Sequence, residues 1–469
     1  MRKYFVLSFL CMAILCMAMP AKAQPALRLP AIFSDHAVLQ QNSEVKLWGW
    51  APCTWPVRIS CSWNPNDTVS VMPAKDCTWV VSIKTPEASE TSHTITFVSD
   101  KQKITINDIL IGEVWLCSGQ SNMEYSFSWG TAGAGDDVAQ STNRTIRFFQ
   151  ISHLYNNFPQ TNSDGEWKIC TPETVNEMSV LGYYLGKRIH EATRRPVGLI
   201  ASYWGGTCVQ AWMPQEVFTG NEELNKVAGN LSPVSWAPVA PSVIYNAMIH
   251  PLIPYRIAGT IWYQGEANTE QPQDYGKLFT GLIESWREMF NNDFPFYFVQ
   301  IAPWNGYGGI SAAILREQQE SALSLPKTGM IGVGDLVDDI TDIHPRMKPA
   351  VGNRLADLVL KEQYGMNNLQ PYHPRFSNVT INKDKVNISI TSTGKLTCKG
   401  KEIKHFQIAG EDKVFYPATT VLEKNGTITA ASAQVKNPVA VRYCFTNDAM
   451  PNLFDVNGLP LLPFRTDKW

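Results

Sequence analysis

Residues 109–123 read ILIGEVWLCSGQSNM, an apolar run that passes directly into a short polar segment. Between Ile109 and Cys117 the only charged residue is Glu113, which predicts a strand buried on both faces. The segment from Ser118 to Met123 then supplies hydroxyl and amide groups at the end of that strand. In parallel sheets, ligands bind beyond the carboxyl ends of the strands, so this segment is the first place to look for chemistry.

The chain continues as alternating strands and helices. Further apolar strands are expected at 197–203, 257–263, 296–301 and 330–333, and helices at 177–195, 275–290, 312–323 and 349–360. The helix at 275–290 has the clearest period, since Leu278, Leu282 and Trp286 fall on one stripe. Repetition of strand and helix predicts the α/β class, with a parallel sheet flanked by helices.

The two flanking regions have a different residue pattern. Residues 24–106 and 371–469 contain short β-rich runs separated by Pro, Asn, Asp and Gly clusters, which indicates antiparallel strands. The predicted organisation is therefore a β-rich segment at 24–106, an α/β domain at 107–370 and a second β-rich segment at 371–469. One sandwich built from both ends of the chain and two separate sandwiches are both compatible with this pattern.

Residues 1–23 have the features of a secretory signal peptide. Arg2 and Lys3 precede an apolar run, and Ala21-Lys22-Ala23 forms a small-x-small cleavage site. The run is shorter than the ~20 residues of a spanning helix, so we expect no membrane span and an exported protein, periplasmic or extracellular. Export permits disulfides among the cysteines, but their pairing cannot be read from the sequence.

Composition excludes several classes of function. The 469 residues carry 40 Lys and Arg against 42 Asp and Glu, a formal net charge of −2, so binding to nucleic acid by a broad basic face is not expected. Neither a Cys-x-x-Cys pair nor a His-Glu-x-x-His motif occurs, so no metal site is predicted. The sequence does not determine an oligomeric state.

Polar segments follow the expected strands at corresponding ends. They contain Ser121, the pair Gly205-Gly206, the amides Gln264 and Asn268, and an acidic loop at 335–346 that holds His344. Each segment taken singly is ordinary turn chemistry. Together at one sheet edge they provide what acyl transfer requires: a hydroxyl nucleophile, an imidazole base, and donors for an oxyanion. His344 is the candidate base because no other histidine sits beside carboxylates in a loop after an expected strand.

Four of these blocks resemble those of a known family. GQSNM at 119–123, WGGT at 204–207, WYQGEAN at 262–268 and DIHP at 342–345 are similar to the blocks of SGNH hydrolases, and more closely to the sialate O-acetylesterase family of carbohydrate esterases. Residues 34–40 and the ending GLPLLPFRTDKW also resemble that family, so the similarity covers nearly all of the mature chain. It implies an SGNH-hydrolase-like, flavodoxin-like sheet with β-sandwich segments at both ends.

The resemblance also implies roles for individual residues. Ser121 would be the nucleophile and His344 the general base, and the oxyanion hole would use the N–H groups of Ser121 and Gly206 with the amide of Gln264, or alternatively Asn268. Thr341 occupies the place of the family's acidic residue. Asp342 is then the expected substitute, and a Ser-His dyad supported by a backbone carbonyl is the alternative.

The implied reaction is hydrolysis of O-acetyl esters on sialic acids, with no metal or organic cofactor. Acetylated xylan or another polysaccharide is the same-class alternative, and a non-catalytic carbohydrate-binding protein is the different-class alternative. A cation for the sialic acid carboxylate would favour the first, and Arg316 and Arg346 are the candidates. Indole rings that could stack on a sugar, if they are not simply core residues, are those of Trp129, Trp204, Trp212, Trp236 and Trp304.

Overall fold

The computed structural model describes residues 26–229 and 232–469. The expected signal peptide at 1–23 lies outside these residues. Across the two described ranges, none of the helices combines the length and the apolar character needed to cross a membrane.

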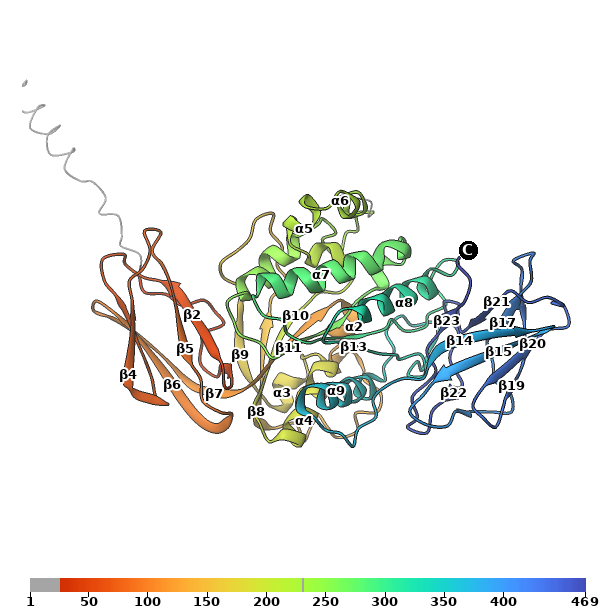
Figure 1. Ribbon diagram of the computed structural model, residues 1–469. Helices are drawn as coiled ribbons and strands as arrows, with labels where there is room; N and C mark the ends of the chain where they lie inside the picture. Colours follow the sequence, from red (N-terminus) through yellow and green to blue (C-terminus); the bar gives the residue numbers. More distant parts are fainter. Residues whose placement is uncertain (1–25, 230–231) are drawn as a thin grey trace, which may run out of the picture.

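A large, mostly parallel sheet forms the centre of the protein (Figure 1). Its strands, in spatial order, are β13 (Thr328–Ile331), β12 (Phe296–Val299), β11 (Gly259–Tyr263), β7 (Gln102–Gly119), β10 (Val197–Tyr203), β8 (Asn143–Ile151) and β9 (Gly165–Cys170). Only β9 runs antiparallel to its neighbour on this path. All five expected strands are present, and β8 and β9 extend the sheet beyond them. The α/β class is thereby confirmed.

Helices cover both faces of this sheet. Because successive strand residues point to opposite sides, each strand contributes side chains to the core under both helix layers. Helices α7 (Tyr275–Met289) and α8 (Ser311–Ser321) lie on one face, and α4 (Val180–Thr193) and α9 (Lys348–Tyr364) on the other (Figure 1). On β11, Trp262 packs into the apolar cluster of the first face, whereas Ile261 and Tyr263 belong to the cluster of the second. Short helices occupy the connections: α2 (Ser121–Glu124), α3 (Pro172–Val175), α5 (Gln215–Thr219) and α6 (Glu222–Ala228).

Strand β7 joins the central sheet to the N-terminal β-rich segment. Its first half pairs antiparallel with β6 (Ser89–Ser99), and its second half lies between β10 and β11. The expected domain boundary at 106/107 therefore falls inside one continuous strand. The remaining strands of this segment are β1 (Val38–Gln40), β2 (Glu44–Trp50), β3 (Val57–Cys61), β4 (Asn64–Val71) and β5 (Thr78–Lys84). A disulfide joins Cys53 to Cys77 there.

The C-terminal β-rich segment is a separate sandwich of two four-stranded antiparallel sheets. One contains β14 (Arg375–Asn382), β15 (Lys385–Thr391), β20 (Ile428–Ala431) and β19 (Thr419–Leu422); the other contains β18 (Phe415–Pro417), β17 (Phe406–Ala409), β21 (Ala440–Tyr443) and β23 (Phe464–Arg465). A two-stranded pair, β16 (Thr397–Cys398) with β22 (Leu453–Phe454), lies beside them. Ile388, Ile408 and Val441 share one apolar cluster, so the two sheets pack face to face.

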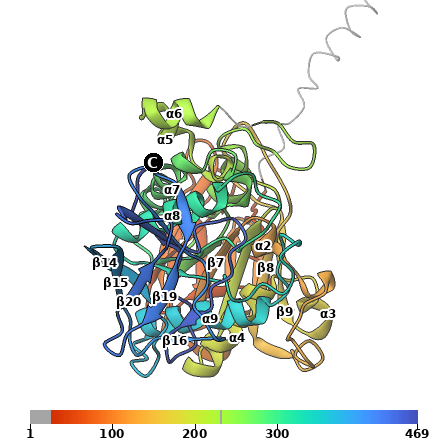
Figure 2. The same cartoon turned by 90° about the vertical axis from the view of Figure 1, so that its right-hand side faces the viewer.

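The two β-rich segments lie at opposite ends of the protein, with the central sheet between them (Figure 1). In the view along the long direction of the protein, the C-terminal strands stand in front of the central sheet (Figure 2). Of the two arrangements that the sequence left open, the structure has two separate β parts.

Candidate active site

Ser121 is presented by a sharp turn from β7 into α2. Gly119 has φ +140°, and a Cβ at this position would lie 2.2 Å from the carbonyl oxygen of Tyr263 on the neighbouring strand. Only glycine therefore permits so close an approach. The next residue, Gln120, donates its backbone N–H to the same carbonyl at 3.0 Å. The turn fixes Ser121 at the carboxyl end of the sheet.

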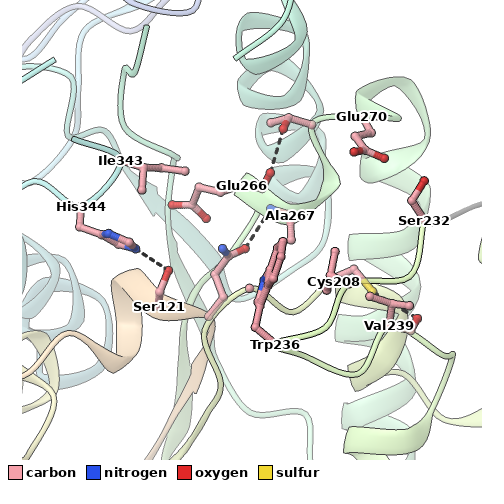
Figure 3. A pocket seen from close by; sticks show the side chains of 14 residues that line it. Ser121, Cys208, Ser232, Trp236, Val239, Glu266, Ala267, Glu270, Ile343 and His344 are labelled. Atoms are coloured by element: carbon pink, nitrogen blue, oxygen red, sulfur yellow. Dashed lines mark hydrogen bonds between the residues drawn. The ribbon is translucent and has the colours of Figure 1, made fainter. Parts of the chain in front are cut away.

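His344 reaches the same place from the loop between β13 and α9. Its Nε2 lies 2.8 Å from Oγ of Ser121, and the two side chains point toward each other (Figure 3). The pKa of the imidazole is lowered from 6.5, mainly by burial and further by the charge of Lys348, while Asp342 opposes the shift. A neutral imidazole in contact with a hydroxyl can accept its proton.

Asp342 lies beside the imidazole without hydrogen bonding to it. Its Oδ1 accepts the backbone N–H of His344 at 2.8 Å and stands 3.7 Å from Nδ1 of the ring. Thr341, at the place of the family's acid, donates both its N–H and its hydroxyl to Asp339. Ser121 and His344 thus form a hydrogen-bonded pair, and Asp342 supplies a nearby charge.

A buried polar network holds the His344 loop against α2. The amide nitrogen of Asn122 donates to Oε1 of Glu266 at 2.6 Å and to the carbonyl of Ile343 at 3.2 Å. Lys348 donates to Oδ1 of Asn122 at 2.7 Å and to the carbonyl of Pro345 at 2.5 Å. The carbonyls on both sides of His344 are therefore fixed by this network.

Burial perturbs both charged groups of the network. It lowers the pKa of Lys348 to about 7 and raises the pKa of the Glu266 carboxyl. Sequence reasoning missed Lys348, because a lysine at the start of a helix gives no sign that it is buried. Asn122 lies in the GQSNM block and Glu266 in the WYQGEAN block. Their position in these blocks was the signal in the sequence that could have identified them.

The structure does not place the expected oxyanion amides at Ser121. Gln264 is fully buried, and its Nε2 donates to the Thr207 carbonyl at 3.1 Å and to Oδ1 of Asn268 at 2.8 Å. Asn268 donates in turn to Oε1 of Gln210 at 2.8 Å. This geometry runs against the expectation for Gln264 and Asn268, because their amides join the segment after β11 to the segment after β10 within the protein.

The side chain of Gln120, in contrast to those of Gln264 and Asn268, lines the hollow beside Ser121. Its Oε1 accepts the backbone N–H groups of Gly265 and Ala267, each at 3.2 Å. Backbone N–H groups can only donate, so they fix which end of this amide is oxygen. In the described part of the chain no group accepts a hydrogen bond from its Nε2, and Gln120 lines the same hollow as Ser121.

Ser121 and His344 open into a hollow of about 430 Å³. Gly206 lines it at φ +75°, beneath the indole of Trp236. Its other lining residues are Gln120, Cys208, Ser232, Val234, Trp236, Val239, Glu266, Ala267, Thr269, Glu270 and Ile343. This lining, over the described residues, includes two carboxylates and neither lysine nor arginine.

The two arginines considered for a substrate carboxylate are engaged elsewhere. Arg316 is buried and donates to the carbonyls of Thr446 and Asn447 beside the C-terminal sandwich. Arg346 pairs with Asp338 at 2.7 Å on the surface. Neither arginine lines the hollow, so neither is placed to meet a carboxylate bound near Ser121.

The five tryptophans fall into distinct places. Trp212 is a core residue with no exposed surface, whereas Trp236 is 68% exposed and lines the hollow. Trp129 stands edge-on to His344 at 6.1 Å between ring centres, and Trp304 donates to the Thr341 carbonyl at 3.0 Å. Trp204 stacks on His153. Trp236 is therefore able to stack on a sugar in the hollow, whereas Trp212 is not.

Comparison with known proteins identifies a family. Residues 111–361 match the family described as carbohydrate esterase, sialic acid-specific acetylesterase. The sialate O-acetylesterase of Homo sapiens is 27% identical over 408 residues, which cover 77% of this chain and 76% of the human protein. That of Mus musculus is 25% identical over 491 residues, covering 88% of each chain.

The resemblance extends to a solved structure. A carbohydrate acetylesterase from Xanthomonas citri superposes with a TM-score of 0.85 and 31% identity, covering 95% of this chain and all of the other (100%). The likeness therefore includes both β-rich segments as well as the central sheet.

Proposed function

Since this chain belongs to the sialic acid-specific acetylesterase family of carbohydrate esterases, we propose that it hydrolyses O-acetyl esters on sialic acids. The observation that carries the mechanism is the 2.8 Å contact between Nε2 of His344 and Oγ of Ser121 at the hollow. The family assignment supplies the ester class, and relatives named sialate O-acetylesterase support the choice of sugar.

The reaction proceeds in two acyl-transfer steps. Ser121 Oγ attacks the acetyl carbonyl while His344 Nε2 takes its proton, and collapse of the tetrahedral intermediate returns that proton to the departing sugar oxygen. Water then attacks the acetyl-Ser121 ester with His344 again as base. Acetate leaves and the Ser121 hydroxyl is restored. Asp342 contributes its negative charge beside the imidazolium that forms in each step.

The oxyanion would be held by donors that line the hollow. We assign the N–H groups of Ser121 and Gly206, together with Nε2 of Gln120, in place of the amides of Gln264 and Asn268. Gln120 is supported by its NH₂ group, which has no acceptor among the described residues, and by the two backbone donors that hold its oxygen in place. Donors fixed before reaction stabilise developing charge without reorganisation.

Three further assignments belong to the same proposal. The central sheet is of the SGNH-hydrolase type, supported by Ser121 after β7, Gly206 after β10 and His344 between β13 and α9. The chain divides into β-rich segments at 24–106 and 371–469 around an esterase domain at 107–370, with strand β7 crossing the first boundary. The protein is exported, to the periplasm or beyond, which the Cys53–Cys77 disulfide supports because disulfides persist in oxidising compartments.

One observation favours a second candidate substrate. The described lining of the hollow presents Glu266 and Glu270 with no cation to balance a sialic acid carboxylate. An uncharged acetylated sugar, as in acetylated xylan, does not need such a cation. Acetate release from O-acetylated sialic acid and from acetylated xylan, measured side by side, separates the two, and preference for xylan would replace the first proposal.

The serine mechanism has its own test. Ser121→Ala should lower kcat for acetate release and for p-nitrophenyl acetate by at least ~10³-fold, the scale for loss of a nucleophile. Ser128→Ala, a nearby exposed serine, is the matched control and should keep full activity. Wild-type protein that binds acetylated glycans without releasing acetate would favour the non-catalytic binding protein instead.

A further inference from the structure

A second hollow adjoins the catalytic one. It has a volume of about 450 Å³ and shares Val234, Trp236 and Val239 with the hollow that contains Ser121. Because the shared residues line both spaces, the two hollows lie on either side of Trp236, whose side chain is 68% exposed. A ligand whose reacting end lies at Ser121 can therefore reach the second hollow across this indole.

The second hollow has an aromatic wall, in which Trp204 is held in place by stacking. Trp204 lines it and stacks on His153, with ring centres 4.6 Å apart and planes within 4°. His153 is held by the carboxylate of Glu124 at 3.1 Å. Tyr155 also lines the hollow, and its ring centre lies 6.3 Å from that of Trp204. Its side chain is 63% exposed.

The chemistry of this wall suits a neutral sugar. Its described lining holds no charged side chain, and besides the rings it offers the polar groups of Asn157 and Ser235. Sugar rings present apolar C–H faces to aromatic rings and hydroxyls to amides and hydroxyl groups. A charged unit would lose hydration here without finding a partner.

We propose that the second hollow binds the uncharged sugar to which the acetylated sugar is glycosidically linked. The enzyme then removes acetyl groups from sugars that are still part of a glycan, in preference to the free monosaccharide. This inference rests on the proposed esterase function, and it adds a binding subsite formed by Tyr155, Trp204 and Trp236.

The test compares one acetylated sugar in two forms. The substrates are free O-acetylated sialic acid and the same sialic acid linked to lactose, with kcat/KM measured as acetate release. Wild-type enzyme should prefer the linked form. Tyr155→Ala should lower kcat/KM for it by up to about tenfold, the scale of one aromatic contact, and so reduce the ratio of linked to free. Tyr155→Phe should restore that ratio, because it keeps the ring.

Phe158→Ala is the matched control, since Phe158 is 74% exposed and lines neither hollow. It should leave both substrates unchanged. A wild-type ratio near one, or an equal loss on both substrates in Tyr155→Ala, would overturn the subsite. If neither sialic acid substrate is cleaved, the sialate proposal fails separately, and acetylated xylose and xylobiose test the subsite in the same way.

Discussion

Nε2 of His344 lies 2.8 Å from Oγ of Ser121, although the two residues are separated by 223 positions in the chain. The contact joins a turn after the first parallel strand to a loop after the last one. It brings the proposed base and the proposed nucleophile together, while Asp342 and Lys348 act on the imidazole with opposite charges. The pH dependence of the enzyme should report that balance.

Wild-type kcat/KM should rise with pH to a plateau, with an apparent pKa below 6.5. In the proposed mechanism the base is the neutral imidazole. Because burial lowers the pKa of His344 from 6.5, activity should be lost only as pH falls below that lowered value. A pH–rate profile for p-nitrophenyl acetate measures it. An apparent pKa above 6.5 on the acid limb would show that burial does not lower the pKa of His344.

Asp342→Asn should move the acid limb to still lower pH. The carboxylate raises the pKa of His344, so removing its charge lowers that pKa, while the asparagine oxygen can still accept the backbone N–H of His344. Plateau kcat should fall by less than about tenfold, whereas loss of an orienting aspartate in a complete triad costs ~10⁴-fold. A loss on that larger scale would show that Asp342 orients the ring.

Lys348→Met should move the acid limb the other way. Lys348 has a pKa of about 7, so it is largely charged in the pH range where His344 titrates, and that charge lowers the pKa of the imidazole. Its removal should raise the pKa of His344 and reduce kcat/KM most strongly at acidic pH. Lys348→Arg, which keeps a charge, should leave the limb near its wild-type position if the variant folds, as checked by circular dichroism.

Gln120→Glu should lower kcat by ~10²- to 10³-fold, the range for loss of one oxyanion donor, with little change in KM. The carboxylate can still accept the N–H groups of Gly265 and Ala267, so the turn is kept while the donor is lost. Steady-state kinetics with unchanged thermal unfolding would establish this. Undiminished kcat would remove Gln120 from the oxyanion hole.

Gly119→Ala should destabilise the protein by at least ~1–3 kcal/mol, the scale of a strained backbone position. A methyl group there would lie 2.2 Å from the Tyr263 carbonyl oxygen, at φ +140°. Gly308→Ala has no neighbouring atom within 4 Å and is the control. Denaturant unfolding of both variants should show a lower midpoint for Gly119→Ala alone.

Local sequence was sufficient to predict the elements that position the site. Apolar runs marked the strands before Ser121 and Gly206, and helical spacing marked α7, because burial on two faces or on one stripe leaves a direct trace in residue order. The same patterns missed β9. Its sequence GEWKIC mixes polar with apolar residues over a short span, so it resembles the connection that surrounds it.

The sequence by itself thus determined the α/β class, the order of the polar blocks and the candidates Ser121 and His344, since strand ends and turns are set by near neighbours in the chain. Only the tertiary structure decided that Gln264 donates to the Thr207 carbonyl and that Gln120 lines the hollow. It also decided that Arg316 donates to carbonyls beside the C-terminal sandwich, and that the two β parts are separate. A side chain's hydrogen-bond partner depends on which distant segments fold against it, and residue order alone does not specify that.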